Sequence, residues 1–167
     1  MSAMKLESER LLLLPLRPEE LRLLCFDLPE LERRLNISYQ SEPVEGVFSE
    51  IIRNQLEICE RRPESYLWDS FWLLLRREDR VAVGSADFKA PPDEQGRVEI
   101  GYGLGKAFRG QGYMSEAVSA MCRWALSQPG VKNILAGTEG DNLPSQSVLR
   151  RCGFCELARG GIIWWIL

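Results

Sequence analysis

The segment at residues 108–117 constrains the fold more than any other part of the chain. In it, Arg109 precedes two glycines, Gly110 and Gly112, directly after an expected strand and directly before an expected helix. Glycine lets the backbone approach a ligand closely and adopt positive φ. The first amides of a helix are unpaired donors with partial positive charge. Together with the arginine, this arrangement predicts a phosphate-binding turn.

Hydrophobic periodicity and turn residues divide the rest of the chain into strands and helices. Apolar runs predict strands at residues 9–17, 70–76, 80–89, 97–104, 131–138, 155–158 and 162–167. Helical spacing predicts helices at 45–61, 112–127 and 144–151, and a first helix that begins at Pro18, is interrupted by Pro29 and is followed by a further turn at 31–35. The pattern is that of a mixed α+β domain, in which the strands on either side of the helix after Gly112 form a right-handed parallel crossover.

Length and charge limit the possible classes of function. The 167 residues fit a single domain, 1–167, that is long enough to bury a core. Lys and Arg total 21 against 24 Asp and Glu, and this formal charge of −3 argues against a general nucleic-acid surface. The apolar run at 11–14 is too short to cross a bilayer, and the N-terminus lacks a charged-then-apolar signal pattern. We therefore expect a cytoplasmic protein with neither nucleic acid nor membrane as a partner.

The chain offers little for metal chemistry. It has no histidine, the commonest general base and metal ligand. Cys152 and Cys155 form a C-x-x-C pair, but a zinc site would need a second pair or histidines. A redox pair would lead into a helix rather than follow one. We therefore expect no metal site and interpret both cysteines as small buried residues.

Two common phosphate motifs do not match the segment. A P-loop requires G-x-x-x-x-G-K-[ST], and Gln111 stands where its lysine is required. A dinucleotide fingerprint requires G-x-G-x-x-G opening a helix. Gly101 and Gly103 instead lie within an expected strand, with Lys106 at the place of the third glycine. Glycines inside a strand indicate either a bulge or a close approach by another group.

The segment resembles instead the coenzyme A signature of the GNAT superfamily of N-acetyltransferases, [Q/R]-x-x-G-x-[G/A], with Arg109 and Gly112 at its first fixed positions. Further matches in the same order spread over most of the chain and are similar to the RimJ/RimL branch, the ribosomal-protein N-terminal acetyltransferases. These matches are residues 83–85, Phe88, 98–104, Gly112 with Tyr113, 115–117, Asp141 with Asn142, Pro144 with Ser145, 148–149, 153–154 and 164–165.

This resemblance implies a fold, a cofactor and a reaction. The implied GNAT fold has a twisted, mostly antiparallel sheet with one splayed parallel strand pair, flanked by about four helices. The implied cofactor is acetyl-CoA, and the reaction is direct attack of a primary amine on the thioester in a ternary complex. The implied cofactor-binding residues are Tyr102, Gly103, Leu104, Arg109, Gly110, Gln111, Gly112, Tyr113, Met114, Asn142 and Ser145.

The catalytic candidates are fewer. Without histidine, the base that deprotonates the amine must be Asp, Glu, Tyr or a chain of waters. Glu99 is the first candidate, because its strand borders the expected thioester, and Glu139 is the second; Glu99 is equally compatible with a solvated strand face. Leu149 stands where many members carry a tyrosine that protonates the thiolate, and the resemblance implies that Ser145 orders the thiol or a water instead.

Other interpretations stay open beside these. Asn142 is equally compatible with a simple cap, and Ser145 with satisfying backbone donors. Met114 stands where the signature has Gly or Ala, so its side chain must point away from the ligand. Met114 and Leu149 together motivate an alternative, a non-catalytic coenzyme A-binding module with a GNAT fold. Nucleotide binding is a third possibility.

The acceptor is the least constrained part. Its specificity is expected in the helical region 18–61 and the terminal hairpin, with the active site between the cofactor strand and the polar loop at 36–44. A protein N-terminus, which the resemblance favours, a polyamine, an antibiotic and an amino acid are all compatible. The assembly is expected to be a monomer or a homodimer.

Overall fold

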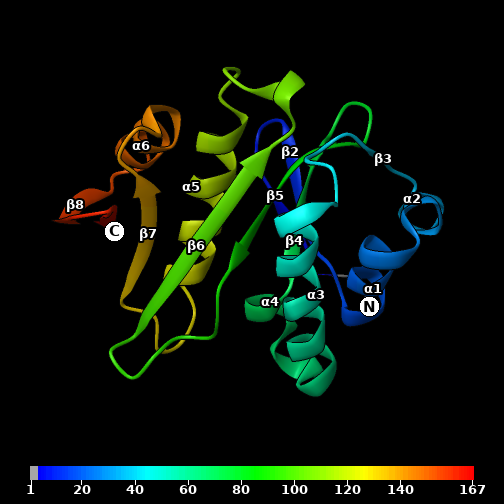
Figure 1. Ribbon diagram of the computed structural model, residues 1–167, viewed down its shortest axis with the longest axis horizontal. Helices are drawn as coiled ribbons and strands as arrows, with labels where there is room; N and C mark the ends of the chain where they lie inside the picture. Colours follow the sequence, from blue (N-terminus) through cyan, green and yellow to red (C-terminus); the bar gives the residue numbers. More distant parts are fainter. Residues whose placement is uncertain (1–3) are drawn as a thin grey trace.

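The computed structural model describes residues 4–167, and its strands form one mixed sheet (Figure 1). The strand order is β1-β2-β4-β5-β6-β7-β9-β8, and β3 pairs with β5 beside this path. The strands are β1 (Leu6–Glu7), β2 (Leu11–Pro15), β3 (Ser38–Tyr39), β4 (Phe71–Arg76), β5 (Val81–Phe88), β6 (Arg97–Leu104), β7 (Asn133–Glu139), β8 (Cys155–Arg159) and β9 (Ile162–Ile166).

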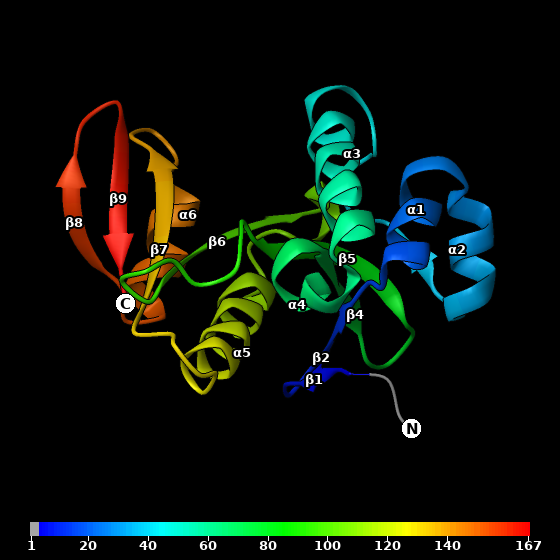
Figure 2. The ribbon, with the colours of Figure 1, turned by 90° about the horizontal axis from the view of Figure 1, so that it is seen from below.

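Helices cover both faces of this sheet, and the two perpendicular views agree on their sides (Figures 1 and 2). Helix α5 lies on one face and α3 on the other, with α1 and α2 beyond α3, while Trp68 of α4 packs against Trp124 of α5. The helices are α1 (Pro18–Phe26), α2 (Leu28–Leu35), α3 (Gly46–Arg61), α4 (Tyr66–Asp69), α5 (Tyr113–Leu126) and α6 (Leu143–Arg151), with short 3₁₀ turns at Pro63–Ser65 and Lys106–Phe108.

The sheet separates two hydrophobic clusters because its central strands are buried on both faces. Every residue of β5 is buried, and so are the first five of β4. One cluster packs α5 against the sheet and includes Trp72 and Phe88. The other packs α1, α2 and α3 against the opposite face and includes Phe71 and Leu73. Alternate residues of a strand point to opposite faces, which places successive residues of β4 in different clusters.

Strands β6 and β7 are parallel, as the crossover through α5 predicts. They pair only from Arg97 to Glu99, opposite residues 133–135, and then diverge (Figure 1). Beyond Glu99, one edge of β6 is therefore free of strand pairing. The other edge stays paired with β5 without any shift in register, so Gly101 and Gly103 mark no bulge there. The irregularity lies one strand away, between Leu74 and Leu75 of β4.

Several expectations need correction. The described residues form six α-helices rather than about four. Pro29 does not interrupt a helix. It lies in the first turn of α2, where a missing N–H costs nothing, and Asp27 caps that helix. Cys155 is exposed and Cys152 only half-buried, so the interpretation of both as buried residues is wrong.

Across residues 4–167, no helix is both long and apolar enough to cross a membrane.

Candidate functional site

A cleft of about 690 Å³ opens where β6 and β7 diverge. The second half of β6, the start of α5 and the first turns of α6 supply its walls, and a loop residue, Glu42, completes it. The structure brings together nine of the predicted cofactor residues here: Tyr102, Gly103, Leu104, Arg109, Gly110, Gly112, Met114, Asn142 and Ser145.

The phosphate-binding turn has the backbone that its glycines predict. Gly110 has φ of 75° and Gly112 has φ of 84°, a region that strains most other residues. Gly112 is the N-cap residue of α5, so the unpaired amides of a 14-residue helix begin directly after it. A side chain at position 110 would meet nothing within 4 Å. The turn is therefore open toward the cleft and carries the positive end of the α5 dipole.

Two predicted residues of this turn do not line the cleft. Gln111 donates through Nε2 to the Ala107 carbonyl oxygen at 3.2 Å, and it is not among the residues that line the cleft. Tyr113 is buried in the core, and the Arg10 guanidinium lies 4.4 Å from the centre of its ring. Met114 is also buried in the core cluster, although it borders the cleft as well. The residue that departs from the signature thus packs largely into the core.

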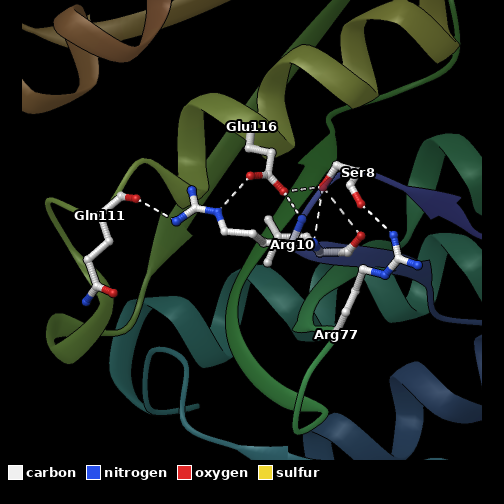
Figure 3. A network of polar contacts seen from close by, with 6 residues as sticks. Ser8, Arg10, Arg77, Gln111 and Glu116 are labelled. Atoms are coloured by element: carbon white, nitrogen blue, oxygen red, sulfur yellow. Dashed lines mark hydrogen bonds and ion pairs between the residues drawn. The ribbon is translucent and has the colours of Figure 1, made fainter.

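A polar network holds the turn from the side of the β1–β2 connection (Figure 3). The Glu116 carboxylate accepts from Ser8 Oγ, from the Arg10 backbone N–H at 2.8 Å and from Arg10 Nε at 3.0 Å. Arg10 Nη1 also donates to the carbonyl oxygen of Gln111 at 2.9 Å. Arg77 extends the network by donating to the carbonyl oxygen of Ser8 at 2.8 Å.

The charge of Glu116 follows from these contacts. Burial would raise the pKa of Glu116, but hydrogen bonds from Ser8 and Arg10 outweigh burial and hold it below its ordinary value. Neither Ser8 nor Arg10 was expected at the site. They lie about a hundred residues from the turn in sequence, and no local pattern connects the two segments.

Tyr102, Ser145 and Asn142 form a hydrogen-bonded group across the cleft. The Tyr102 hydroxyl lies 2.7 Å from Ser145 Oγ, joining β6 to α6. Asn142 is the N-cap of α6 and accepts from the Ser145 backbone N–H at 3.2 Å, so it caps this helix and also borders the cleft. Burial raises the pKa of Tyr102 to about 12, and the hydrogen bond to Ser145 opposes this rise.

The two carboxylate candidates occupy different places. Glu99 is half-buried at the last paired position between β6 and β7, and it is not among the residues lining the cleft. Burial raises the pKa of Glu99, Lys89 opposes the rise and Asp87 adds to it. Glu139 is exposed at the end of β7. A carboxylate with a raised pKa is a stronger base than an ordinary one, which suits Glu99 as a candidate base.

Glu42 is a cleft residue that the sequence did not single out. It belongs to the loop at 36–44, where the active site was expected, and its carboxylate lies where a side chain at position 103 would be. Burial raises the pKa of Glu42, and the charge of Arg109 opposes this. The only sequence signal for this contact is Gly103, whose missing side chain leaves room for the carboxylate.

Comparisons with known proteins agree with this architecture. A sequence profile of the acetyltransferase (GNAT) domain matches residues 10–155. The chain is 33% identical over 149 residues to the uncharacterized N-acetyltransferase YjdG of Bacillus subtilis (strain 168), a match that covers 83% of this chain and 88% of that protein.

Solved structures share the fold. One is RimL, a ribosomal L7/L12 alpha-N-protein acetyltransferase in complex with coenzyme A, with a TM-score of 0.69 and 18% identity, covering 98% of this chain and 97% of that one. Another is the ribosomal-protein-S5-alanine acetyltransferase from Vibrio fischeri, with a TM-score of 0.67, 16% identity and coverage of 98% and 96%. These likenesses support the RimJ/RimL-like resemblance at the level of the fold. Since the family profile spans most of the sequence and a relative above 30% identity covers it as well, the chain belongs to the GNAT family of acetyltransferases.

Proposed function

We propose that the protein is an acetyl-CoA-dependent N-acetyltransferase in which a primary amine attacks the thioester directly, in a ternary complex. The observation that carries the proposal is the single cleft that connects the positively charged turn at Gly110 and Gly112 with the hydroxyl pair of Tyr102 and Ser145. One end of this cleft suits phosphates, and the other end offers groups for proton transfer.

The cleft fits coenzyme A in charge and in hydrogen-bonding groups. The amides that follow Gly112 and the Arg109 guanidinium suit the diphosphate. The unpaired edge of β6 at Tyr102–Leu104 offers backbone groups to the amide-rich pantetheine arm, as a sheet edge does to an added strand. The Ser115 hydroxyl at the cleft is buried without a hydrogen-bond partner among the described residues, which leaves it free for a ligand.

In the proposed reaction, the amine nitrogen forms a bond to the acetyl carbon, and the carbon–sulfur bond breaks. Glu99 takes a proton from the incoming ammonium through water, so that the attacking amine is neutral. The Ser145 hydroxyl donates a proton to the departing thiolate, and Tyr102 replaces that proton across their 2.7 Å contact. The second proton, which the attacking nitrogen loses as the amide forms, returns through water to the Tyr102 phenolate. A phenol with a pKa of about 12 is protonated at neutral pH and can serve as this donor.

We favour a protein N-terminus as the acceptor and keep a small-molecule amine as the alternative. Two proteins with the same fold, RimL and the Vibrio fischeri enzyme, carry names that refer to ribosomal-protein acetylation. The carboxylates of Glu42 and Glu99, on the same face of β6, would attract a cationic amine of either kind.

Release of free thiol from acetyl-CoA, measured with a panel of N-terminal peptides, polyamines and amino acids, tests the proposal. We expect release that depends on one class of acceptor. Thermal stabilisation by coenzyme A without turnover on any acceptor would favour the alternative, a non-catalytic coenzyme A-binding module. Stabilisation by ATP rather than by coenzyme A would point to nucleotide binding.

The base assignment has its own test. Glu99→Gln keeps the shape of the side chain but removes the proton acceptor, so we expect kcat to fall roughly a hundredfold or more. Glu139→Gln, at an exposed position, is the matched control and should stay within about twofold of wild type. If Glu99→Gln leaves the rate of the chemical step unchanged, Glu99 is not the base.

A further inference from the structure

Three charged side chains share one face of the sheet next to the point where β6 and β7 diverge. Asp87 of β5 lies directly opposite Gly101 of β6. Lys89 lies opposite Glu99, because its backbone N–H donates to the Glu99 carbonyl oxygen at 2.9 Å. Residues two apart on a strand, and residues opposite each other on paired strands, point to the same face. The side chains of Asp87, Lys89 and Glu99 therefore form one charged cluster on this face of the sheet.

Asp87 is the buried member of this group. It is only 3% exposed, and its Oδ2 has no hydrogen-bond partner among the described residues. An ionised carboxylate in such a place is costly unless a cation compensates it. The Lys89 ammonium supplies that cation, with Nζ 3.7 Å from Asp87 Oδ2.

Gly101 makes the approach of Lys89 possible. A Cβ atom at position 101 would lie 2.7 Å from Lys89 Nζ and 2.9 Å from Asp87 Oδ1, closer than real side chains allow. The ammonium thus occupies the space over Gly101. Although the backbone of Lys89 lies opposite Glu99, its side chain extends toward Asp87.

Among residues 4–167, Glu99 therefore has no ion-pair partner. Lys89 is the cation that acts on Glu99, yet within residues 4–167 the only carboxylate that Lys89 pairs with is Asp87. On its other side, Glu99 faces the apolar Leu135 of β7. Lys89 and Asp87 are the charged groups that act on Glu99, and both come from the β5 side.

We infer that Asp87 is a positioning residue, which holds the Lys89 ammonium over Gly101 and thereby keeps the Glu99 carboxylate unpaired and available as a base. The inference rests on the proposed role of Glu99. Burying the Asp87 carboxylate costs free energy, and the inference gives this residue a function. Without Asp87, Lys89 would pair with Glu99, and that pair would have to break before Glu99 could take a proton.

The direction in which each substitution changes the pKa of Glu99 follows from this arrangement. Asp87→Asn removes a negative neighbour of Glu99 and releases Lys89 to pair with it, and both effects lower the pKa of Glu99. Lys89→Met removes the positive neighbour, which raises the pKa of Glu99. The two substitutions therefore act in opposite directions, whereas a merely structural disturbance has no reason to do so.

The first test is the pH profile of kcat/KM with one fixed acceptor, because its acidic limb reports the base of the free enzyme. We expect Asp87→Asn to shift this limb to lower pH by about one unit and to lower the plateau severalfold. Lys89→Met should shift the limb to higher pH. The double variant Asp87→Asn with Lys89→Met should recover the plateau, because no cation is left to pair with Glu99.

The second measurement does not depend on turnover. NMR titration of the Glu99 carboxyl in the free protein should show a lower pKa in Asp87→Asn and a higher pKa in Lys89→Met. Lys89 is half-exposed, so we expect Lys89→Met to fold, and the pKa of Glu99 can be measured in this variant even if Asp87→Asn fails to fold. Shifts in the same direction for both variants, or no shift in Lys89→Met, would overturn the inference. Opposite NMR shifts together with full activity of Glu99→Gln would instead reject the base assignment and retain the electrostatic arrangement.

Discussion

At the scale of single residues, the contact between Tyr102 and Ser145 carries the most specific chemical content. Leu149 is buried where many GNAT members carry a tyrosine, so the proposed reaction needs another proton donor for the departing thiolate. The Tyr102 hydroxyl is 2.7 Å from Ser145 Oγ at the cleft, and its raised pKa keeps it protonated. A serine hydroxyl that is itself hydrogen-bonded to a protonated phenol can donate one proton and regain another.

Tyr102→Phe tests this pair. We expect kcat to fall roughly tenfold to a hundredfold, because proton transfer by a positioned side chain contributes at least that much. The loss should be constant over the whole assay range below the Tyr102 pKa of about 12. The measurement is kcat against pH, with Tyr66→Phe on α4 as the control outside the cleft-lining residues. A rate equal to that of wild type would remove Tyr102 from the proton path.

At the scale of elements, the start of α5 depends on a segment from the other end of the chain. Arg10 lies between β1 and β2, yet it contacts the Gln111 carbonyl oxygen, the Tyr113 ring and Glu116 (Figure 3). These contacts fix both sides of Gly112, the residue at which the turn becomes a helix. The network therefore couples the edge of the sheet to the orientation of the amides that are predicted to bind phosphate.

Glu116→Gln should weaken this coupling. Hydrogen bonds to a charged group contribute about 1.5 to 3 kcal/mol, so we expect a loss of roughly that size in the free energy of unfolding at neutral pH. The pKa of Glu116 is lowered in the folded state, so this contribution is present above the unfolded pKa and is lost as pH falls through the folded value. Wild type and variant should therefore converge in acid.

Urea denaturation at neutral and acidic pH measures this difference, with Glu50→Gln on the exposed side of α3 as the control. The KM for acetyl-CoA should rise in Glu116→Gln, while the KM for acetyl-pantetheine, which lacks the diphosphate, should stay the same. Equal changes for both donors would mean that the network has no special relation to the phosphate-binding turn.

The elements also show what the sequence could predict. Long amphipathic helices such as α3 and α5 follow from their apolar periodicity, and the glycines of the turn have the positive φ that their position predicts. Strands β1 and β3 have two residues each, too few for any periodicity to indicate. Arg10 and Glu42 reach the site only through tertiary contacts, which a local pattern does not contain.

At the scale of the whole molecule, the position of the cleft depends on how tightly β6 is held on its paired side. One edge of β6 is free of strand pairing beyond Glu99, so among the described strands only β5 pairs with the second half of β6. Gly84 of β5 lies opposite Leu104 at the cleft end of β6. A Cβ atom at position 84 would be 2.5 Å from the Gly103 carbonyl oxygen and 2.7 Å from Leu104 Cδ2.

Gly84→Ala should therefore push the cleft end of β6 away from β5. Overpacking of this kind typically costs about 1 to 3 kcal/mol of stability, and we expect the KM for acetyl-CoA to rise with it. Gly140→Ala is the matched control, because a Cβ atom there meets nothing within 4 Å. Thermal unfolding and the KM for acetyl-CoA are the two measurements. Unchanged values in Gly84→Ala would show that the sheet adjusts without moving the cleft.

The proposed reaction transfers an acetyl group from acetyl-CoA, bound in this cleft, to an amine. The most direct measurement counts the products of a single reaction, with mass spectrometry of the acceptor for the amide and a thiol reagent for free coenzyme A. We expect one acetylated amine for every thiol released, with both products depending on the acceptor and both strongly reduced in Glu99→Gln. Thiol release without an acetylated acceptor, or tight binding of acetyl-CoA without either product, would contradict the proposed reaction.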